Sequence, residues 1–399
     1  MMQTITNETL PMMPSTKPKW GAVFALSLAA FALVASEFMP VSLLTPIANN
    51  LHISEGQAGQ AISISGGFAL ITCLLITSLT RGLNRKRLLL SLTLLMIVSG
   101  TVVTIAPNYE IFMIGRALIG VAIGGFWSMS AATAMRLVPE NNVPRALAIL
   151  NGGNALAMVV AAPLGSFLGD LIGWRGAFFF VVPVASITFF WLLASLPAMK
   201  AGNETNSDNI FRLLNNAPVA FGMAAVSLFF MGQFALFTYL RPFLETVTKV
   251  SGSMLSLMLL AIGVAGFIGT ILIERFLKNR LYGTLIVIPL LMVIIIMALE
   301  FFGGFSIATT SLLAMWGLVA TAAPVAWWTW LSRTLPQNAE AGGALMVAVI
   351  QLAIMLGAVL GGLLYDYRGY QATFSMSAVL LSASAFLAFL TARAQKQYI

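Results

Sequence analysis

Two ionisable residues stand inside long apolar stretches of this sequence, where they could do chemistry: Glu37 in the first stretch and Arg116 in the fourth. A charge near the bilayer centre costs at least about 2.5–3.5 kcal/mol, so such residues usually face a bundle interior or a wet cavity. Burial disfavours the ionised form of a carboxyl group, so it can exchange a proton as its access to water changes. We therefore predict that Glu37 carries a proton and that Arg116 is a functional or gating charge. The alternatives are a structural glutamate paired with Arg116, and an arginine that only anchors packing.

Other side chains in the apolar stretches could contact a solute, because aromatic rings stack on flat molecules and amides can read their edges. Trp127 follows Arg116 by eleven residues, about three helical turns, and so returns to the same helix face. Tryptophan and tyrosine also anchor helices at the lipid interface, and that role or simple packing is the alternative for each aromatic residue. The predicted solute contacts are Trp127, Asn151, Asn154, Gln233, Phe237, Trp327 and Gln351, with Tyr239, Trp316, Trp328 and Trp330 as further aromatic candidates.

The elements that position these residues follow from composition. Of the 399 residues 59% are hydrophobic and only 9% are charged, whereas soluble proteins carry roughly 25% charged residues. A membrane-spanning helix needs about 20 apolar residues. The sequence therefore predicts an all-α integral membrane protein with twelve transmembrane helices, near 20–46, 57–80, 88–106, 111–135, 146–168, 177–196, 217–240, 252–273, 282–300, 305–331, 342–364 and 372–392.

Charge sets the predicted orientation. An even number of spans places both ends on one side, and sixteen of the 21 lysines and arginines fall on that side, against four on the other. We therefore expect both termini in the cytoplasm. The net charge of +8 is scattered in short clusters, which argues against nucleic acid as a partner. The single cysteine, Cys73, excludes an intrachain disulfide.

The chain divides into two similar parts. We expect a cytoplasmic leader over 1–19, six-helix halves over 20–196 and 217–399, and a polar cytoplasmic linker over 197–216. An offset of 196 residues places Pro46, Gly165, Asp170, Gly173 and Phe178 on identical residues, and it places Glu37 on Gln233. We therefore predict two repeats with the substrate path between them.

Small residues and a proline mark two of the predicted helices. Gly120 and Gly124 follow Arg116 at four and eight residues and form a smooth ridge on which a neighbouring helix can pack closely. Pro163 and Gly165 would bend and thin the fifth helix toward its outer end.

Several of these strings resemble those of the major facilitator superfamily, and within it the drug and solute proton antiporters. GRALIGVAIGG resembles the arginine-glycine motif of the fourth helix, and AAPLG followed by GWRGAFFF resembles the antiporter segment of the fifth helix and the entry to the sixth. The loop RGLNRKR, with Arg81, Arg85 and Arg87, resembles the gating loop between the second and third helices. Arg81 stands where the family pattern has aspartate, and Asn84 where it has glycine.

The strings EFMPVSLLTP, ISEGQAGQ, GGFWSMSA, MRLVP, SFLGDLIGWR, NIFRLL and FTYLRP resemble bacterial purine ribonucleoside efflux proteins. This resemblance implies the major facilitator fold and export of inosine-like or guanosine-like nucleosides in exchange for protons. It also implies no cofactor beyond the proton gradient. The resemblance further implies a location in a bacterial inner membrane. We expect a monomer in the lipid bilayer.

Other functions fit less well. Multidrug or sugar efflux by the same antiport mechanism is the first alternative, and a transporter-like solute sensor is a remote one. An enzyme is not expected, because the sole histidine, His52, falls in an outer loop and no predicted helix carries a catalytic or metal-binding set.

Overall fold

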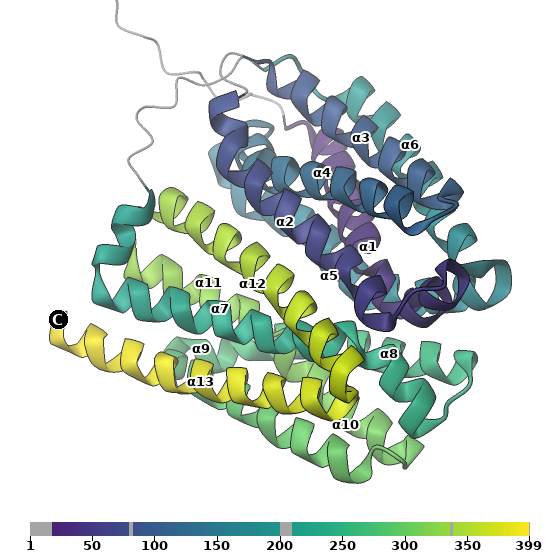
Figure 1. Cartoon of the computed structure of the whole chain (residues 1–399). Coiled ribbons are helices and arrows are strands. Elements are labelled where there is room, and N and C mark those ends of the chain that lie inside the picture. Colours follow the sequence, from purple (N-terminus) through teal and green to yellow (C-terminus); the bar gives the residue numbers. More distant parts are fainter. Residues whose placement is uncertain (1–17, 80–82, 200–209, 336–337, 399) are drawn as a thin grey trace, which may run out of the picture.

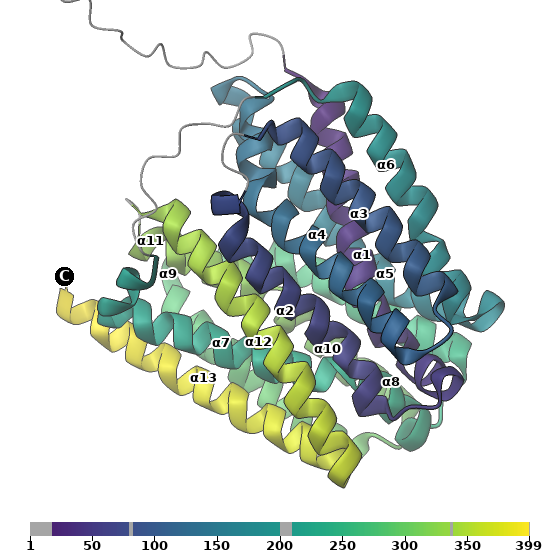
Figure 2. The same ribbon diagram turned by 45° about the horizontal axis from the view of Figure 1, so that its top comes forward.

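The computed structural model describes residues 18–79, 83–199, 210–335 and 338–398. Within these ranges the regular structure is entirely helical, and the chain forms two helix bundles that lie side by side (Figures 1 and 2). The predicted leader over 1–19, apart from its last two residues, and the residue Arg81 lie outside the described ranges. The predicted linker over 197–216 lies partly outside them, and its end forms the short helix η2, Ile210–Asn215.

The N-terminal bundle pairs α1 with α5 and α6, and α4 with α2 and α3. Its helices are α1 (Trp20–Leu51), α2 (Glu55–Leu79), α3 (Arg85–Ile105), α4 (Tyr109–Arg136), η1 (Glu140–Asn142), α5 (Val143–Phe179) and α6 (Val181–Ser195).

The C-terminal bundle packs α13 against α7 and α9, and α10 against α9. Its helices are α7 (Ala217–Thr238), α8 (Leu240–Phe243), η3 (Leu244–Thr248), α9 (Gly252–Phe302), α10 (Ser306–Ala320), α11 (Ala323–Thr334), α12 (Ala339–Arg368) and α13 (Tyr370–Tyr398).

The described residues contain eleven apolar helical stretches long enough to cross a membrane. One of them, Glu140–Ser195, has 56 residues, enough for two spans at about 20 residues each. It is broken at Gly173, whose φ of 76° only glycine adopts at no steric cost. The break separates the fifth span from the sixth, so the prediction of a twelve-helix all-α membrane protein is confirmed.

Helix ends and crossings explain why these spans pack as they do. The side chains of Asn84 and Asn108 cap α3 and α4 by accepting hydrogen bonds from Lys86 N at 2.9 Å and Ile111 N at 3.1 Å. At Gly120 and Gly124 the main chain of α2 lies so close that no Cβ would fit. The glycine ridge therefore seats α2 directly on α4.

The two bundles meet along two helix pairs, α2 with α12 and α5 with α9, and the first pair is visible in both Figure 1 and Figure 2. Between these seams, α1 contacts the C-terminal bundle, where Phe38 stacks on Phe234 with 5.4 Å between ring centroids. An interface built from a few helices on each side can house a site between the bundles.

Candidate functional site

Glu37 is buried near the middle of α1, with 5% of its surface exposed. The side-chain amide of Gln351, on α12 of the other bundle, lies near its carboxyl group. Among the described residues no basic nitrogen comes within 4.0 Å of the carboxylate to form an ion pair. Glu37 thus touches both bundles without a fixed counter-charge in contact.

Arg116, on α4, is fully buried, and its guanidinium group contacts the main chain of α1. It donates hydrogen bonds to the carbonyl oxygens of Ser36 at 2.7 Å, Glu37 at 3.0 Å and Ala61 at 3.1 Å, and to Ser65 Oγ at 3.2 Å. Arg116 therefore meets Glu37 at its carbonyl group, while its charge remains close enough to interact electrostatically with the carboxyl.

A proline explains why α1 accepts this arginine. Pro40 lies inside α1 and has no N–H, so the carbonyl of Ser36 loses its normal helical donor. In a membrane such a carbonyl must find another partner, and the Arg116 guanidinium supplies it. The buried cation thus has a structural role at α1, and the functional or gating role of Arg116 stays a prediction.

A small cavity lies between the bundles, bounded by α1, α5, α7, α9 and α10. Its lining side chains are uncharged. They are Phe38, Ala157, Met158, Ala161, Ala162, Gln233, Phe234, Phe237, Ile262, Gly263, Trp316, Gly317, Ala320 and Thr321.

The cavity holds two side chains that the sequence predicted as solute contacts, Gln233 and Phe237, and the further candidate Trp316. The hydroxyl of Thr321 donates a hydrogen bond to Gly317 O at 2.8 Å. The side-chain oxygen of Gln233 is buried and has no hydrogen-bond partner among the described residues. Gln233 is therefore the cavity residue with a free polar group to offer a ligand.

Phe38 and Glu37 are neighbours on α1 but face different surroundings. Phe38 borders the cavity, whereas Glu37 faces Gln351 and lies beside Arg116. A change in the charge of Glu37 would act on the α1 segment that forms a wall of the cavity.

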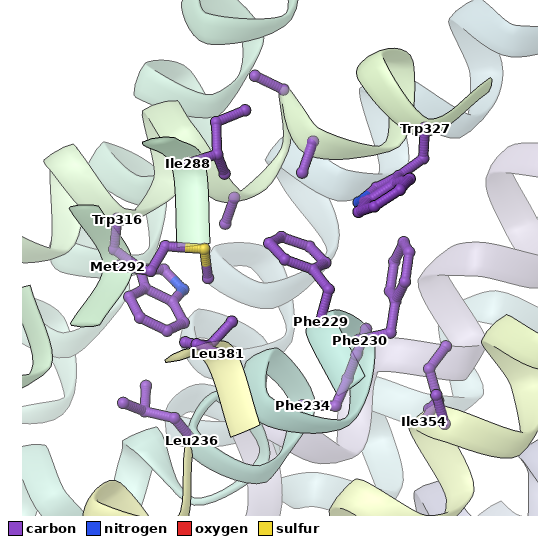
Figure 3. Packing of buried hydrophobic residues seen from close by; sticks show 14 of the residues in the cluster. Phe229, Phe230, Phe234, Leu236, Ile288, Met292, Trp316, Trp327, Ile354 and Leu381 are labelled. Atoms are coloured by element: carbon purple, nitrogen blue, oxygen red, sulfur yellow. The ribbon is translucent and has the colours of Figure 1, made fainter. Parts of the chain in front are cut away.

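The other predicted solute contacts lie elsewhere. Trp327 is 1% exposed and lies in the buried cluster with Phe229 and Phe230 (Figure 3), where its ring meets Trp330 edge to face. Asn151 is exposed, and its amide donates to Leu147 O of its own helix at 2.9 Å.

Trp127 is half-buried and packs edge to face on Phe126, and Asn154 is half-buried on α5. Gln351 lies beside Glu37 and is not among the residues that line the cavity. The structure therefore places two of the seven predicted solute contacts, Gln233 and Phe237, on the cavity wall.

The residues predicted to act in conformational change occupy helix crossings and one helix start. Arg85 and Arg87 begin α3, the first half-buried and the second exposed. Gly165 lies where a Cβ would come within 2.6 Å of Ser42 Oγ on α1. Pro163 lies inside α5, the helix that packs against α9.

Among the described residues, no group of three or more His, Cys, Asp or Glu side chains is placed to hold a metal ion. The site is an apolar cavity with one free amide, and a buried carboxyl group lies next to the cavity residue Phe38 along α1. A cavity of this kind can bind a small solute.

Comparisons with known proteins identify a family and relatives of this chain. The family profile described as "Major Facilitator Superfamily" matches residues 26–347. "Transcription regulatory protein OpdE" of Pseudomonas aeruginosa is 58% identical over 99% of this chain and 99% of its own. "Purine ribonucleoside efflux pump NepI" of Escherichia coli K12 is 40% identical over 93% of this chain and 94% of its own.

A solved structure gives the same fold. The bacterial homologue of the human lysosomal transporter Spinster, in an inward-facing and unoccupied conformation, superposes with a TM-score of 0.77 at 15% identity. The match covers 95% of this chain and 98% of that one. At this identity the likeness concerns the fold.

Proposed function

The chain belongs to the major facilitator superfamily of transporters, and from that premise we propose that it exports purine ribonucleosides such as inosine or guanosine in exchange for protons. We place it in the bacterial inner membrane with both termini in the cytoplasm, because its basic residues gather on the side of the termini. The proton gradient supplies the energy, and no cofactor is required.

The observation that carries the proposal is the uncharged cavity between the bundles. The rings of Phe38, Phe234, Phe237 and Trp316 offer flat apolar surface, and Gln233 offers an amide to the edge of a heterocycle. A cation or a phosphate entering this cavity would lose hydration without meeting an opposite charge on its lining. The lining therefore favours a neutral, flat solute over cationic drugs and nucleotides.

Glu37 provides the coupling in this proposal. Open to the outside, it takes up a proton and the solute is released. Open to the inside, it loses the proton and the solute loads. Arg116 brings its charge near the carboxyl group, and Gln351 lies near the same group from the opposite bundle. The charge of Glu37 therefore bears on how the two bundles meet.

The experiment described in the next paragraph also tests two alternative functions. Multidrug or sugar efflux would use the same antiport mechanism with another solute. A solute sensor would bind without transporting, a role raised by the 58% identical relative named as a transcription regulatory protein. Export of a solute that controls gene expression would also give such a relative an effect on transcription, so that name and transport are compatible.

The test is uptake into inside-out vesicles under an imposed pH gradient, acid inside, with labelled inosine, guanosine, AMP, a hexose and a lipophilic cationic drug. We expect saturable accumulation of inosine or guanosine that collapses when a protonophore removes the gradient. We expect AMP and the cationic drug to stay at the level of vesicles without the protein, because their charge is excluded.

The Gln233→Leu variant serves as the site control and should raise the half-saturating nucleoside concentration about tenfold, as expected for one lost hydrogen bond and an unpaired polar edge. Preferred accumulation of the cationic drug or the hexose would show that this compound, and not a nucleoside, is the solute. Saturable binding of a nucleoside without accumulation would favour the sensor.

A further inference from the structure

Helix α1 contains a second interior proline, and it creates a second free carbonyl. Pro46 has no N–H, so the carbonyl of Ser42, four residues earlier, loses its helical donor just as that of Ser36 does through Pro40. Backbone groups at membrane depth must be satisfied by other protein groups or by water in a cavity. The structure should therefore hold a donor at Ser42.

That donor is Arg241 of α8, which comes from the opposite bundle. Its Nη1 donates a hydrogen bond to the Ser42 carbonyl oxygen, and the arginine is only 5% exposed. The two freed carbonyls of α1 are thus both covered by buried arginines. Arg116 does so from within its own bundle and can stay in place throughout transport, whereas Arg241 must cross the interface.

Carboxylates from both bundles hold Arg241 in position. Its Nε donates to Glu245 Oε1 at 2.7 Å within the C-terminal bundle, and its Nη2 lies 3.7 Å from Asp170 Oδ1 of the N-terminal bundle. The main chain at Gly252, where α9 begins, packs directly on the Asp170 carboxylate. Arg241 therefore joins α1, α5 and its own bundle at a single point.

A second contact closes the same end of the molecule on its other side. Asp366 of α12 accepts hydrogen bonds from Ser54 Oγ at 2.6 Å and from Gly56 N at 3.0 Å, just where α2 begins. Asp366 is the residue that the 196-residue offset pairs with Asp170. Each bundle thus contributes one aspartate to the contacts at the end away from the chain termini.

We propose that Arg241 is a gating residue, and that its bond to the Ser42 carbonyl closes the outer end of the transporter and breaks each time that end opens. Opening must draw α8 away from α1. The Ser42 carbonyl then needs water, which arrives only when the outer passage is hydrated. Pro46 and Arg241 together stabilise the state in which the outer end is closed, whichever solute is transported.

The test is access from outside to a cysteine in the cavity. Ala162 lines the cavity and is buried, so Ala162→Cys in a Cys73→Ser background reports outer opening when intact cells are treated with a membrane-impermeant maleimide. We expect Arg241→Gln to speed labelling about tenfold, as for the loss of one hydrogen bond from a charged donor.

Arg175→Gln is the matched control. Arg175 lies at the same end, but its hydrogen bonds go to Asn50 and Ala106 of its own bundle, so labelling should keep its parental rate. Should Arg241→Gln not reach the membrane, Asp170→Asn tests the same contact from the other bundle, with faster labelling again expected.

A double-mutant cycle distinguishes loss of the hydrogen bond from Arg241 to the Ser42 carbonyl from a general weakening of the packing between the bundles. In Pro46→Ala the new N–H can bond to the Ser42 carbonyl, so Arg241→Gln added to it should speed labelling clearly less than it does alone. The proposal is overturned if folded Arg241→Gln or Asp170→Asn protein labels at the parental rate. It is equally overturned if Arg175→Gln has the same effect, or if the Pro46→Ala and Arg241→Gln effects are independent. Because the readout is access to a cysteine and not transport of a solute, these outcomes do not depend on the nucleoside proposal.

Discussion

Vesicles containing the Glu37→Gln variant are expected to accumulate no nucleoside under a pH gradient, with uptake at the level of vesicles without the protein. Glutamine keeps the shape of the side chain and can still pair with Gln351, but it cannot gain or lose a proton. Downhill exchange of labelled for unlabelled nucleoside should persist, because that reaction needs only the cavity and the alternation of the bundles. The measurement is initial uptake with and without the gradient.

Glu300→Gln provides the control for this change. Glu300 is a second glutamate within a spanning helix, but it lies near the end of α9 and is half-buried, away from the cavity lining. It should retain gradient-driven uptake. Active uptake by Glu37→Gln, or equal loss in both variants, would remove Glu37 as the proton carrier.

Arg116→Leu is expected to lower the free energy of unfolding in detergent by at least about 3 kcal/mol, because hydrogen bonds from a charged donor contribute about 1.5–3 kcal/mol each and the Ser36 carbonyl is left unpaired. Adding Pro40→Ala should recover part of this loss, since the alanine restores a backbone N–H that can bond to the Ser36 carbonyl. The measurement is denaturant-induced unfolding of purified protein in micelles.

Arg145→Leu is the control for the Arg116→Leu variant. Arg145 is exposed and lies 5.1 Å from the centre of the Trp20 ring, a contact that contributes about 0.5–1 kcal/mol. An Arg116→Leu protein as stable as the parent would show that the guanidinium has no structural role at α1.

The twelve helices could be predicted because a helix that crosses the membrane needs about 20 apolar residues, so each span is visible in the sequence as a long apolar stretch. The sequence placed the fifth and sixth spans apart, and the structure separates them at Gly173. The ends of the helices were less predictable. The first span was expected to end near residue 46, but α1 continues through Pro46 to Leu51, since Arg241 from the other bundle covers the carbonyl that the proline frees.

The site was only partly predictable. Gln233 stood out as a polar residue in an apolar helix, and the 196-residue offset linked it to Glu37. Phe38 and Phe234 gave no such signal, because a helix that is apolar on every face does not reveal which face meets a cavity. Asn151 gave the same signal as Gln233, yet its amide bonds to its own helix. Polarity in a span marks a candidate, and only the packing decides where it points.

The partners of Arg116 were also beyond sequence reasoning, although one clue was present. Pro40 predicts that the Ser36 carbonyl needs a donor, but it does not say that the donor comes from α4. A search for carbonyls four residues before each interior proline would have marked Ser36 and Ser42 as the places where buried arginines contact α1.

The most direct test of proton-coupled export is the pH change when nucleoside is added to the purified protein in weakly buffered solution, repeated from about pH 6 to about pH 8, the range in which a buried carboxyl group can titrate. If Glu37 exchanges its proton for solute, the parent releases protons on binding somewhere in this range, and Glu37→Gln binds the nucleoside without releasing any. Binding without proton release by the parent at every pH, or equal release by Glu37→Gln, would contradict the account.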